Sequence, residues 1–210
     1  SIVHNAVHFD RGAGLRTNME RHTKEIKKAA NYMRGKKKKN EFEQIALGAV
    51  DTFFREADEA SRNINSKRFD ERFDRMEQTN ELVHGSYNYH NVFLDVGNGG
   101  NAVTNFEKCH NDCQVADLYQ FLRKVMEKHD WNICGMQLEI LPNDRLKPLE
   151  DDDIDMLVTL LSFPEKFWKI INQYYNAGKA WVPAKNIDKL KIVIEQNMRR
   201  RELIDKMCGM

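Results

Sequence analysis

Apolar side chains recur at steps of three and four residues between Phe42 and Ala60, and this spacing constrains the fold more than any other feature of the sequence. Residues spaced in this way lie on one face of an α-helix. We therefore predict one long helix with a single buried stripe, which other elements must cover. The stripe consists of Phe42, Ile45, Ala46, Ala49, Val50, Phe53, Phe54, Ala57 and Ala60.

Similar spacing predicts helices on both sides of this segment. Residues 61–80 are an exception, because they are polar with only isolated Phe69, Phe73 and Met76, and we predict a loop there with room for a short helix. The expected helices are residues 19–33, a helix capped by Asp117 and running to about Met126, residues 133–141, residues 151–163, a helix opened by Pro164, and Ile187 to about Met207, capped by Asn186.

Residues 82–106 have a different character from the helical segments. Leu82-Val83 is a short apolar strand, and residues 92–94 form a second one that stops at the glycine-rich residues 97–100. Residues 102–106 are the returning strand, so residues 92–106 predict a β-hairpin. The expected fold class is mainly α with a small β-hairpin region (α+β).

Composition narrows the classes of function. The chain has 33 basic and 32 acidic residues, so it lacks the basic excess that binds nucleic acid, and the run Lys36–Lys39 is interpreted as a solvated loop. No stretch approaches the roughly 20 apolar residues of a membrane span, and we expect a cytoplasmic protein. The four cysteines form no CxxC pair and are expected to be reduced thiols.

The densest group of reactive side chains is His-Gly-Ser-Tyr-Asn-Tyr-His-Asn at residues 84–91, between the first strand and the hairpin. Thr-Asn-Phe-Glu at residues 104–107 follows the hairpin. Phosphotransferases of the protein-kinase type place a carboxylate on such a loop, an asparagine about five residues later and an aspartate after the hairpin. The first accepts the proton of the attacking hydroxyl group, and the other two hold Mg²⁺.

The chain resembles the CotS-type spore coat proteins, which belong to the aminoglycoside and choline kinase-like superfamily. The likeness is carried by residues 84–91, 104–108, 117–131, 163–170 and 179–183. The resemblance covers roughly residues 40–205. It implies the helical C-terminal lobe of a protein-kinase-like fold. It further implies that residues 1–18 include the end of the inter-lobe linker, that residues 19–210 form the lobe, and that the smaller lobe is absent from this chain.

Carried over by position, the resemblance puts Ser86 where the superfamily has its catalytic aspartate. Serine is neutral, and its hydroxyl pKa is far too high for the role of proton acceptor. Asn91 matches the metal-binding asparagine, and Asn105 stands where active members usually have a metal-binding aspartate. Two carboxylates are therefore missing from one site, so at most weak binding of ATP and Mg²⁺ is expected.

Three further residues complete the expected site. Glu107 lies two residues beyond Asn105, and in an extended strand both side chains would share a face, so Glu107 is an alternative metal ligand. Asp117 matches an aspartate that hydrogen-bonds the loop backbone, and helix capping is compatible with that role. His84 is expected to brace the loop.

These residues leave open whether the protein is an enzyme. The leading hypothesis is a kinase-like protein of the spore coat, catalytically impaired, whose partners are coat proteins. The rival is an active ATP-dependent phosphotransferase acting on a small hydroxylated molecule, with its N-terminal lobe outside this chain. A third hypothesis is a helical interaction module that uses Lys36–Lys39 on an anionic partner.

Overall fold

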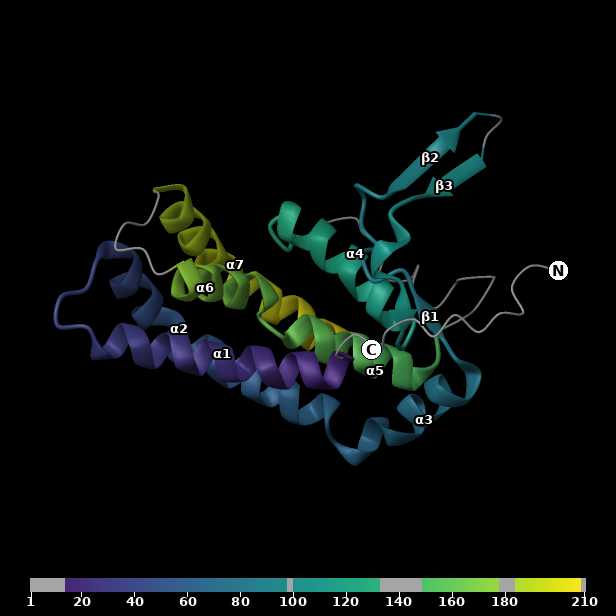
Figure 1. Ribbon diagram of the computed structural model, residues 1–210, viewed down its shortest axis with the longest axis horizontal. Coiled ribbons are helices and arrows are strands. Elements are labelled where there is room, and N and C mark those ends of the chain that lie inside the picture. The colour runs from purple at the N-terminus through teal and green to yellow at the C-terminus, as the bar shows by residue number, and fades with distance from the viewer. Residues whose placement is uncertain (1–13, 98–99, 133–148, 178–183, 209–210) are drawn as a thin grey trace.

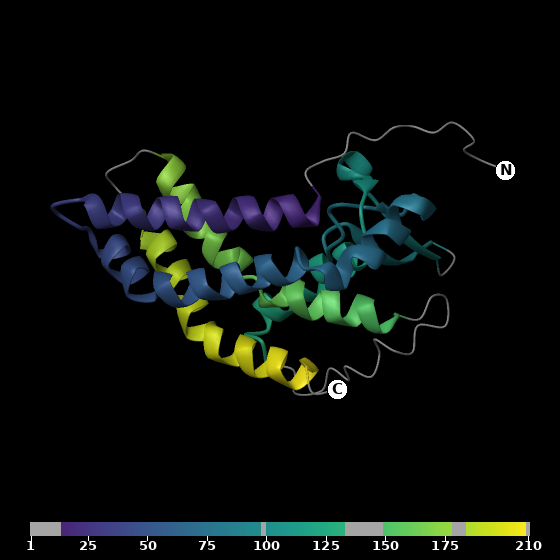
Figure 2. The same cartoon turned by 90° about the horizontal axis from the view of Figure 1, so that it is seen from below.

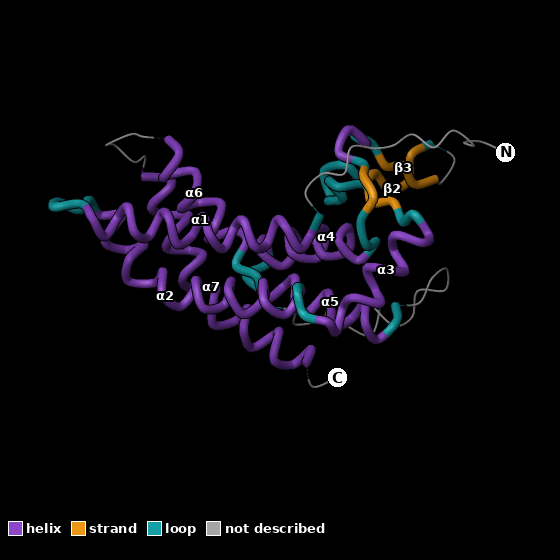
Figure 3. Tube along the Cα trace, turned by 60° about the horizontal axis from the view of Figure 1, so that its bottom comes forward, coloured by secondary structure: helices purple, strands orange, loops and turns teal. Residues whose placement is uncertain are grey.

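The computed structural model describes residues 14–97, 100–132, 149–177 and 184–208. The described chain is mainly helical, with two small antiparallel β-sheets gathered at one end of the helical body (Figures 1 and 3). The expected fold class is therefore confirmed. The helix expected at residues 133–141 and the motif at residues 179–183 lie outside the described residues.

Two long helices, α1 (Leu15–Gly35) and α2 (Glu41–Ile64), lie side by side along the body (Figure 2). A capping box starts α2, because the Asn40 side chain accepts the Glu43 N–H at 2.9 Å and the Glu43 carboxylate accepts the Asn40 N–H at 2.8 Å. Six of the nine predicted stripe residues are buried along α2, and Ile45, Ala49 and Phe54 are partly buried. Both helices were predicted, and both are longer than their apolar spacing indicated.

The lysine run connects α1 to α2, and its first member is not simply solvated. The Lys36 ammonium lies 2.5 Å from the carboxylate of Glu43, whose side chain is fully buried, and 3.2 Å from the Tyr174 hydroxyl. The hydrogen bond to Glu43 raises the pKa of Lys36. Lys37 and Lys38 are exposed as expected. The interpretation of the run as a solvated loop is therefore wrong for Lys36, because a buried carboxylate requires a partner.

Residues 61–80 are more helical than predicted. Helix α2 continues to Ile64, a 3₁₀ turn covers Lys67–Phe69, and α3 (Asp70–Thr79) follows. Helix α3 is held by charge as well as by apolar contacts, since the buried Arg72 side chain bonds Asp153 at 2.7 Å and Glu81 at 2.8 Å. The apolar spacing alone therefore could not predict its extent.

The β region consists of two separate pairs of strands. Strand β1 (Leu82–Val83) pairs with β4 (His110–Asn111), and β2 (Val92–Val96) pairs with β3 (Gly100–Val103). The second pair is the predicted hairpin, and it projects from the helical body (Figure 1). The returning strand ends at Val103 and not at residue 106, because Asn105 adopts a left-handed conformation with φ 68° and a 3₁₀ turn covers Phe106–Lys108.

The rest of the described chain adds four helices to the body: α4 (Val115–Lys128), α5 (Asp151–Ser162), α6 (Glu165–Ala177) and α7 (Ala184–Cys208). Helices α5, α6 and α7 pack against the α1–α2 pair, and α4 packs against α5. The stacked rings of Phe53 and Phe167, with centroids 4.0 Å apart, lie in this core.

The starts of two helices differ from the sequence predictions. Helix α4 begins at Val115, so Asp117 lies in its first turn and is not its cap. Helix α7 begins at Ala184, before Asn186. Helix α6 follows Pro164 as predicted.

Among the helices that the structure describes, none combines the length and the apolar character needed to cross a bilayer.

Candidate functional site

The loop between β1 and β2, residues 84–91, is anchored to the first turn of α4. The carboxylate of Asp117 accepts the backbone N–H of His84 at 2.5 Å and that of Gly85 at 3.0 Å. Two consecutive backbone donors thus share one carboxylate, and hydrogen bonds to a charged acceptor are among the stronger ones in proteins. This use of the side chain explains why Asp117 does not cap α4.

Gly85 allows the loop to pass very close to the segment after the hairpin. Its φ is +70°, and a Cβ at this position would lie 2.1 Å from the carbonyl oxygen of Lys108. A side chain would have to displace backbone there, so only glycine fits without rearrangement.

The buried imidazole of His84 joins the loop to the end of the hairpin. Its Nδ1 accepts the backbone N–H of Ser86 at 3.1 Å, and its Nε2 lies 2.8 Å from the carbonyl oxygen of Thr104. Because a carbonyl oxygen only accepts, Nε2 carries the proton and Nδ1 does not. His84 is therefore a neutral brace with both ring nitrogens occupied.

Ser86 and Asn91 are in contact within the loop. The Asn91 amide nitrogen donates to the Ser86 carbonyl oxygen at 2.8 Å and lies 3.4 Å from the Ser86 hydroxyl oxygen. Asn88 donates to the same carbonyl at 2.8 Å. The amide nitrogen of Asn91 is thus committed to the loop, and its oxygen is the end left to meet a cation.

Asn105 and Glu107 do not share the face of a strand, so the geometry predicted for an alternative metal ligand is wrong. Asn105 is left-handed, Glu107 lies in the 3₁₀ turn, and both are exposed. The hairpin still brings this segment to the loop, because the Thr104 N–H donates to the Asn91 carbonyl at 3.0 Å.

The donors at this site fit Mg²⁺ poorly. Asn91 and Asn105 offer neutral amide oxygens, whereas Mg²⁺ is bound in proteins chiefly through carboxylates and phosphates. Glu107 is the nearest carboxylate in sequence and is solvent-exposed. Within the described residues, no three His, Cys, Asp or Glu side chains gather where they could hold a metal ion.

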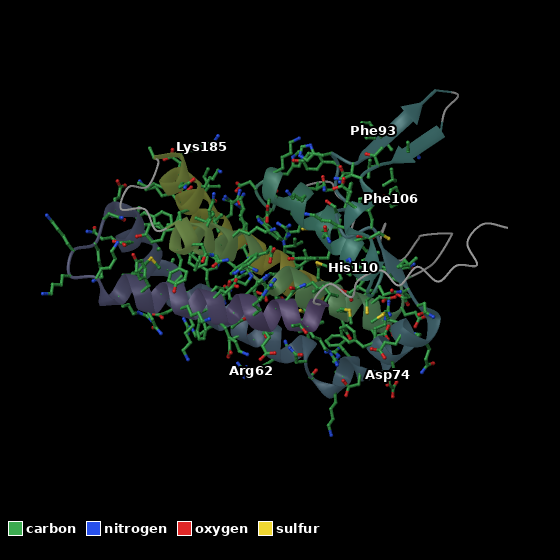
Figure 4. All side chains as sticks on the ribbon, viewed as in Figure 1. Arg62, Asp74, Phe93, Phe106, His110 and Lys185 are labelled. Atoms are coloured by element: carbon green, nitrogen blue, oxygen red, sulfur yellow. The ribbon has the colours of Figure 1, made fainter. Side chains whose placement is uncertain are left out.

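A cavity of about 370 Å³ opens beside the loop, and we refer to it as the loop cavity. It is bounded by the start of α1, the loop, α4, the end of α5 and the start of α6. Phe106 and His110, which Figure 4 labels, flank in sequence the Lys108 of its lining. Its lining comprises Leu15, Asn18, Met19, His22, Gly85, Ser86, Asn88, Lys108, Ala116, Tyr119, Gln120, Arg123, Lys124, Leu160, Phe163, Glu165 and Lys169.

Glu165 is the acidic side chain of this lining, and it is engaged on two sides. His22 lies 3.6 Å from one of its oxygens and Lys169 lies 2.9 Å from the other. Burial alone would raise the pKa of Glu165, but the contact with His22 and the charges of Lys169 and Arg123 lower it to about 2. The carboxylate is therefore ionised throughout the physiological range.

Sequence reasoning missed His22, which lines this cavity, and the contacts that hold the neighbouring segments together. His22 stacks on Trp168 with ring centroids 3.4 Å apart, and Trp168 donates to Glu25 at 2.8 Å. Asp112, only 3% exposed, accepts the backbone N–H groups of Leu15 and Cys113. Apart from the bond between Asp112 and Cys113, these contacts join segments far apart in sequence, and no local pattern signals them.

The cysteines near the loop show no sign of reactivity. Burial raises the pKa of Cys113 to about 12 and also raises that of Cys109. Both are therefore protonated thiols at neutral pH, which are poor nucleophiles and poor metal ligands.

No protein-family model matches the chain, and no curated protein was found to be similar to it. A crystal structure of an aminoglycoside phosphotransferase from Alicyclobacillus acidocaldarius is similar in fold, with a TM-score of 0.81 and 14% sequence identity. The match covers 97% of this chain and 60% of that protein, so the chain spans less than two thirds of its length. The fold is therefore kinase-like.

Proposed function

We propose that this chain is a kinase-like binding protein in which phosphoryl transfer is strongly impaired, and that it serves as a scaffold in the spore coat. The kinase-like fold supports the first part. The resemblance of residues 84–91 and 104–108 to the CotS-type proteins supports the second. A tagged copy that stays diffuse throughout sporulation in a spore-forming host would contradict the coat assignment.

The observation that carries the impairment is Ser86. The loop around it is braced by Asp117 and His84 and contacts Asn91, yet the side chain at its centre is a neutral hydroxyl. In phosphoryl transfer the acceptor oxygen bonds to the γ-phosphorus of ATP while the bond to the β,γ-bridging oxygen breaks, and ADP leaves with that electron pair. The acceptor's proton needs a base, and a serine hydroxyl is not one.

We further propose that residues 19–210 form the helical lobe and that residues 1–18 belong to an inter-lobe linker. Support comes from the alignment with 60% of the neighbour's length, since the part that it leaves over is large enough for a second lobe.

Restoring the missing charges tests the proposal. The double variant Ser86→Asp/Asn105→Asp supplies both carboxylates, and the matched control Ser86→Asn/Asn105→Asp has nearly the same shape without the base. We expect Mg²⁺ to stabilise the first variant more than the wild type in thermal unfolding with ATP, because anionic oxygens bind Mg²⁺ more strongly. Equal responses of wild type and double variant would contradict the account of the site.

A second candidate is an active phosphotransferase for a small hydroxylated molecule, and the loop cavity beside Ser86 is the observation that favours it. This candidate predicts a magnesium-dependent rise in melting temperature when millimolar ATP is added to the wild-type chain. Absence of that rise would remove it for this chain.

A further inference from the structure

The loop cavity is placed to receive whatever molecule the loop serves. Ser86 and Gly85 form part of its wall, and helices α1, α4 and α6 form the rest. Leu15, Met19, Leu160 and Phe163 supply apolar surface. A cavity of about 370 Å³, lined by apolar side chains together with polar and charged ones, is large enough to hold a small molecule.

The charged side chains of this cavity are mainly basic. Lys108, Arg123, Lys124 and Lys169 line it, against the single carboxylate of Glu165. Arg123 has a partner outside the lining, since its guanidinium donates to Glu127 at 2.6 Å. Even with that pair counted as neutral, three lysines face one glutamate.

Of these lysines, Lys108 and Lys124 have no ion-pair partner among the described residues. Lys124 is half-buried, and burial followed by the charge of Arg123 lowers its pKa. The Nε–H of Arg123 is also buried without a hydrogen-bond partner in the part of the chain that is described. Among the described residues, the positive charges of Lys108 and Lys124 are therefore not neutralised by an ion pair, and only the charge of Glu127 offsets that of Lys124 at a distance.

Glu165 does not offer its charge to a ligand. Its two oxygens already face Lys169 and His22, so a cationic ligand would have to displace one of them. Such a ligand would also meet the field of Lys108 and Lys124 at close range. Like charges that share a partly desolvated cavity repel one another.

We propose that the loop cavity binds a small hydroxylated anion, a phosphate monoester or a carboxylate, with the anionic group at Lys124 and Lys108 and a hydroxyl group toward Ser86. The assignment of this ligand as the acceptor-side molecule rests on the proposed kinase-like function. Aminoglycosides, which the structural neighbour's name specifies, carry several protonated amines. The same cavity charge makes them the wrong class for this chain.

Calorimetric titration at low ionic strength, without ATP or Mg²⁺, tests the proposal with sn-glycerol 3-phosphate and D-glycerate as probes. Glycerol is the neutral control and kanamycin the cationic one. We expect at least one anionic probe to bind the wild-type chain at least about tenfold more tightly than glycerol, and we expect no saturable binding of kanamycin.

Charge-reversal variants locate the site. Lys124→Glu should weaken binding of the anionic probe by about tenfold or more, and Lys124→Gln should weaken it less. Lys28→Glu is the matched control, because Lys28 is exposed on α1 outside the cavity and the net charge changes equally. Its affinity should stay within about twofold of the wild type. Circular dichroism and melting temperature show whether each variant is folded. If Lys124→Glu is unfolded, the affinity of Lys124→Gln decides the outcome.

Three results would overturn the proposal: no saturable binding of either anionic probe below 10 mM, equal affinities in the Lys124 and Lys28 variants, or tighter binding of kanamycin. Displacement of the probe by ATP, with the same dependence on Lys124, would overturn the acceptor-side assignment. Because these titrations contain no nucleotide or metal, they report anion binding whether or not the chain proves able to transfer phosphate, and the two proposals can fail separately.

Discussion

At the scale of single residues, Gly85 marks the tightest point of the site. Any substitution at Gly85 would destabilise the fold in two ways. The positive φ strains the backbone of other residues, and a Cβ would lie 2.1 Å from the Lys108 carbonyl oxygen. Gly97 has a similar φ of +61°, but no atom of the described residues lies within 4 Å of its Cβ position. Substitution at Gly97 therefore measures backbone strain alone, whereas substitution at Gly85 measures backbone strain and steric overlap together.

We predict that Gly97→Ala lowers the free energy of unfolding by about 1–2 kcal/mol, the cost of a left-handed alanine. Gly85→Ala should lower it by about 3 kcal/mol or more, because the Lys108 backbone must also move. Urea unfolding of both variants measures the difference. Equal losses would show that the loop does not approach Lys108 as closely as described.

Glu165 predicts a dependence of stability on pH. The pKa of Glu165 is about 2 in the folded protein and about 4.5 in the unfolded chain. Its ionised carboxylate therefore stabilises the fold fully above pH 4.5, and this stabilisation is lost as the pH falls toward 2. Between pH 5.5 and 3.5 the wild type should lose about 1 kcal/mol more stability than Glu165→Gln. Urea unfolding at the two pH values checks this, and parallel losses in the two proteins would contradict it.

The sequence predicted the site residues that lie close together along the chain, but not the contacts that form between distant segments. Ser86 and Asn91 are five residues apart in one loop, so sequence could identify them together. The ring tautomer of His84 depends on the Thr104 carbonyl, and the charge of Glu165 depends on His22. Such contacts follow from the packing of helices and are not encoded in local spacing.

At the scale of elements, α3 depends on charged contacts. Arg72 is 2% exposed in its side chain and bonds both Asp153 on α5 and Glu81 just before β1. Arg75, one turn along, is 41% exposed and pairs with Glu150 at 2.8 Å and with Asp152. The two arginines make similar contacts at very different burial.

We predict that Arg72→Ala lowers the free energy of unfolding by about 3–5 kcal/mol, because it leaves buried carboxylates without their partner. Arg75→Ala should cost about 1 kcal/mol or less, since water screens its pairs. Chemical unfolding of both variants checks the contrast. A small effect at Arg72 would show that apolar packing alone holds α3.

The helices that sequence predicted are those with a continuous apolar stripe, such as α2, α5 and α6. Helix α3 was underestimated because ion pairs position it. Strand β4 (His110–Asn111) was missed because its two polar residues become a strand only by pairing with Leu82 and Val83. The end of β3 was placed too late because Asn105 turns left-handed, which asparagine tolerates better than most residues.

At the scale of the whole molecule, the fold holds the loop at residues 84–91 in place through Asp117 and His84, while Ser86 in that loop carries a neutral hydroxyl. The helical body holds α4 against α5, α4 presents Asp117 to the loop, and the hairpin brings Thr104 and Asn105 alongside it (Figures 1 and 3). The position of the site is thus set by the fold, and its chemistry is set by a few side chains.

Phosphoryl transfer from γ-labelled ATP is the most direct test of the central claim. The purified chain is incubated with Mg²⁺, ATP and a panel of small hydroxylated acceptors that includes glycerol, sn-glycerol 3-phosphate and kanamycin, and labelled product is counted against a reaction without protein. The account predicts no product above that background. Transfer to any acceptor at the ordinary kinase rate of about 1–100 s⁻¹ would contradict it.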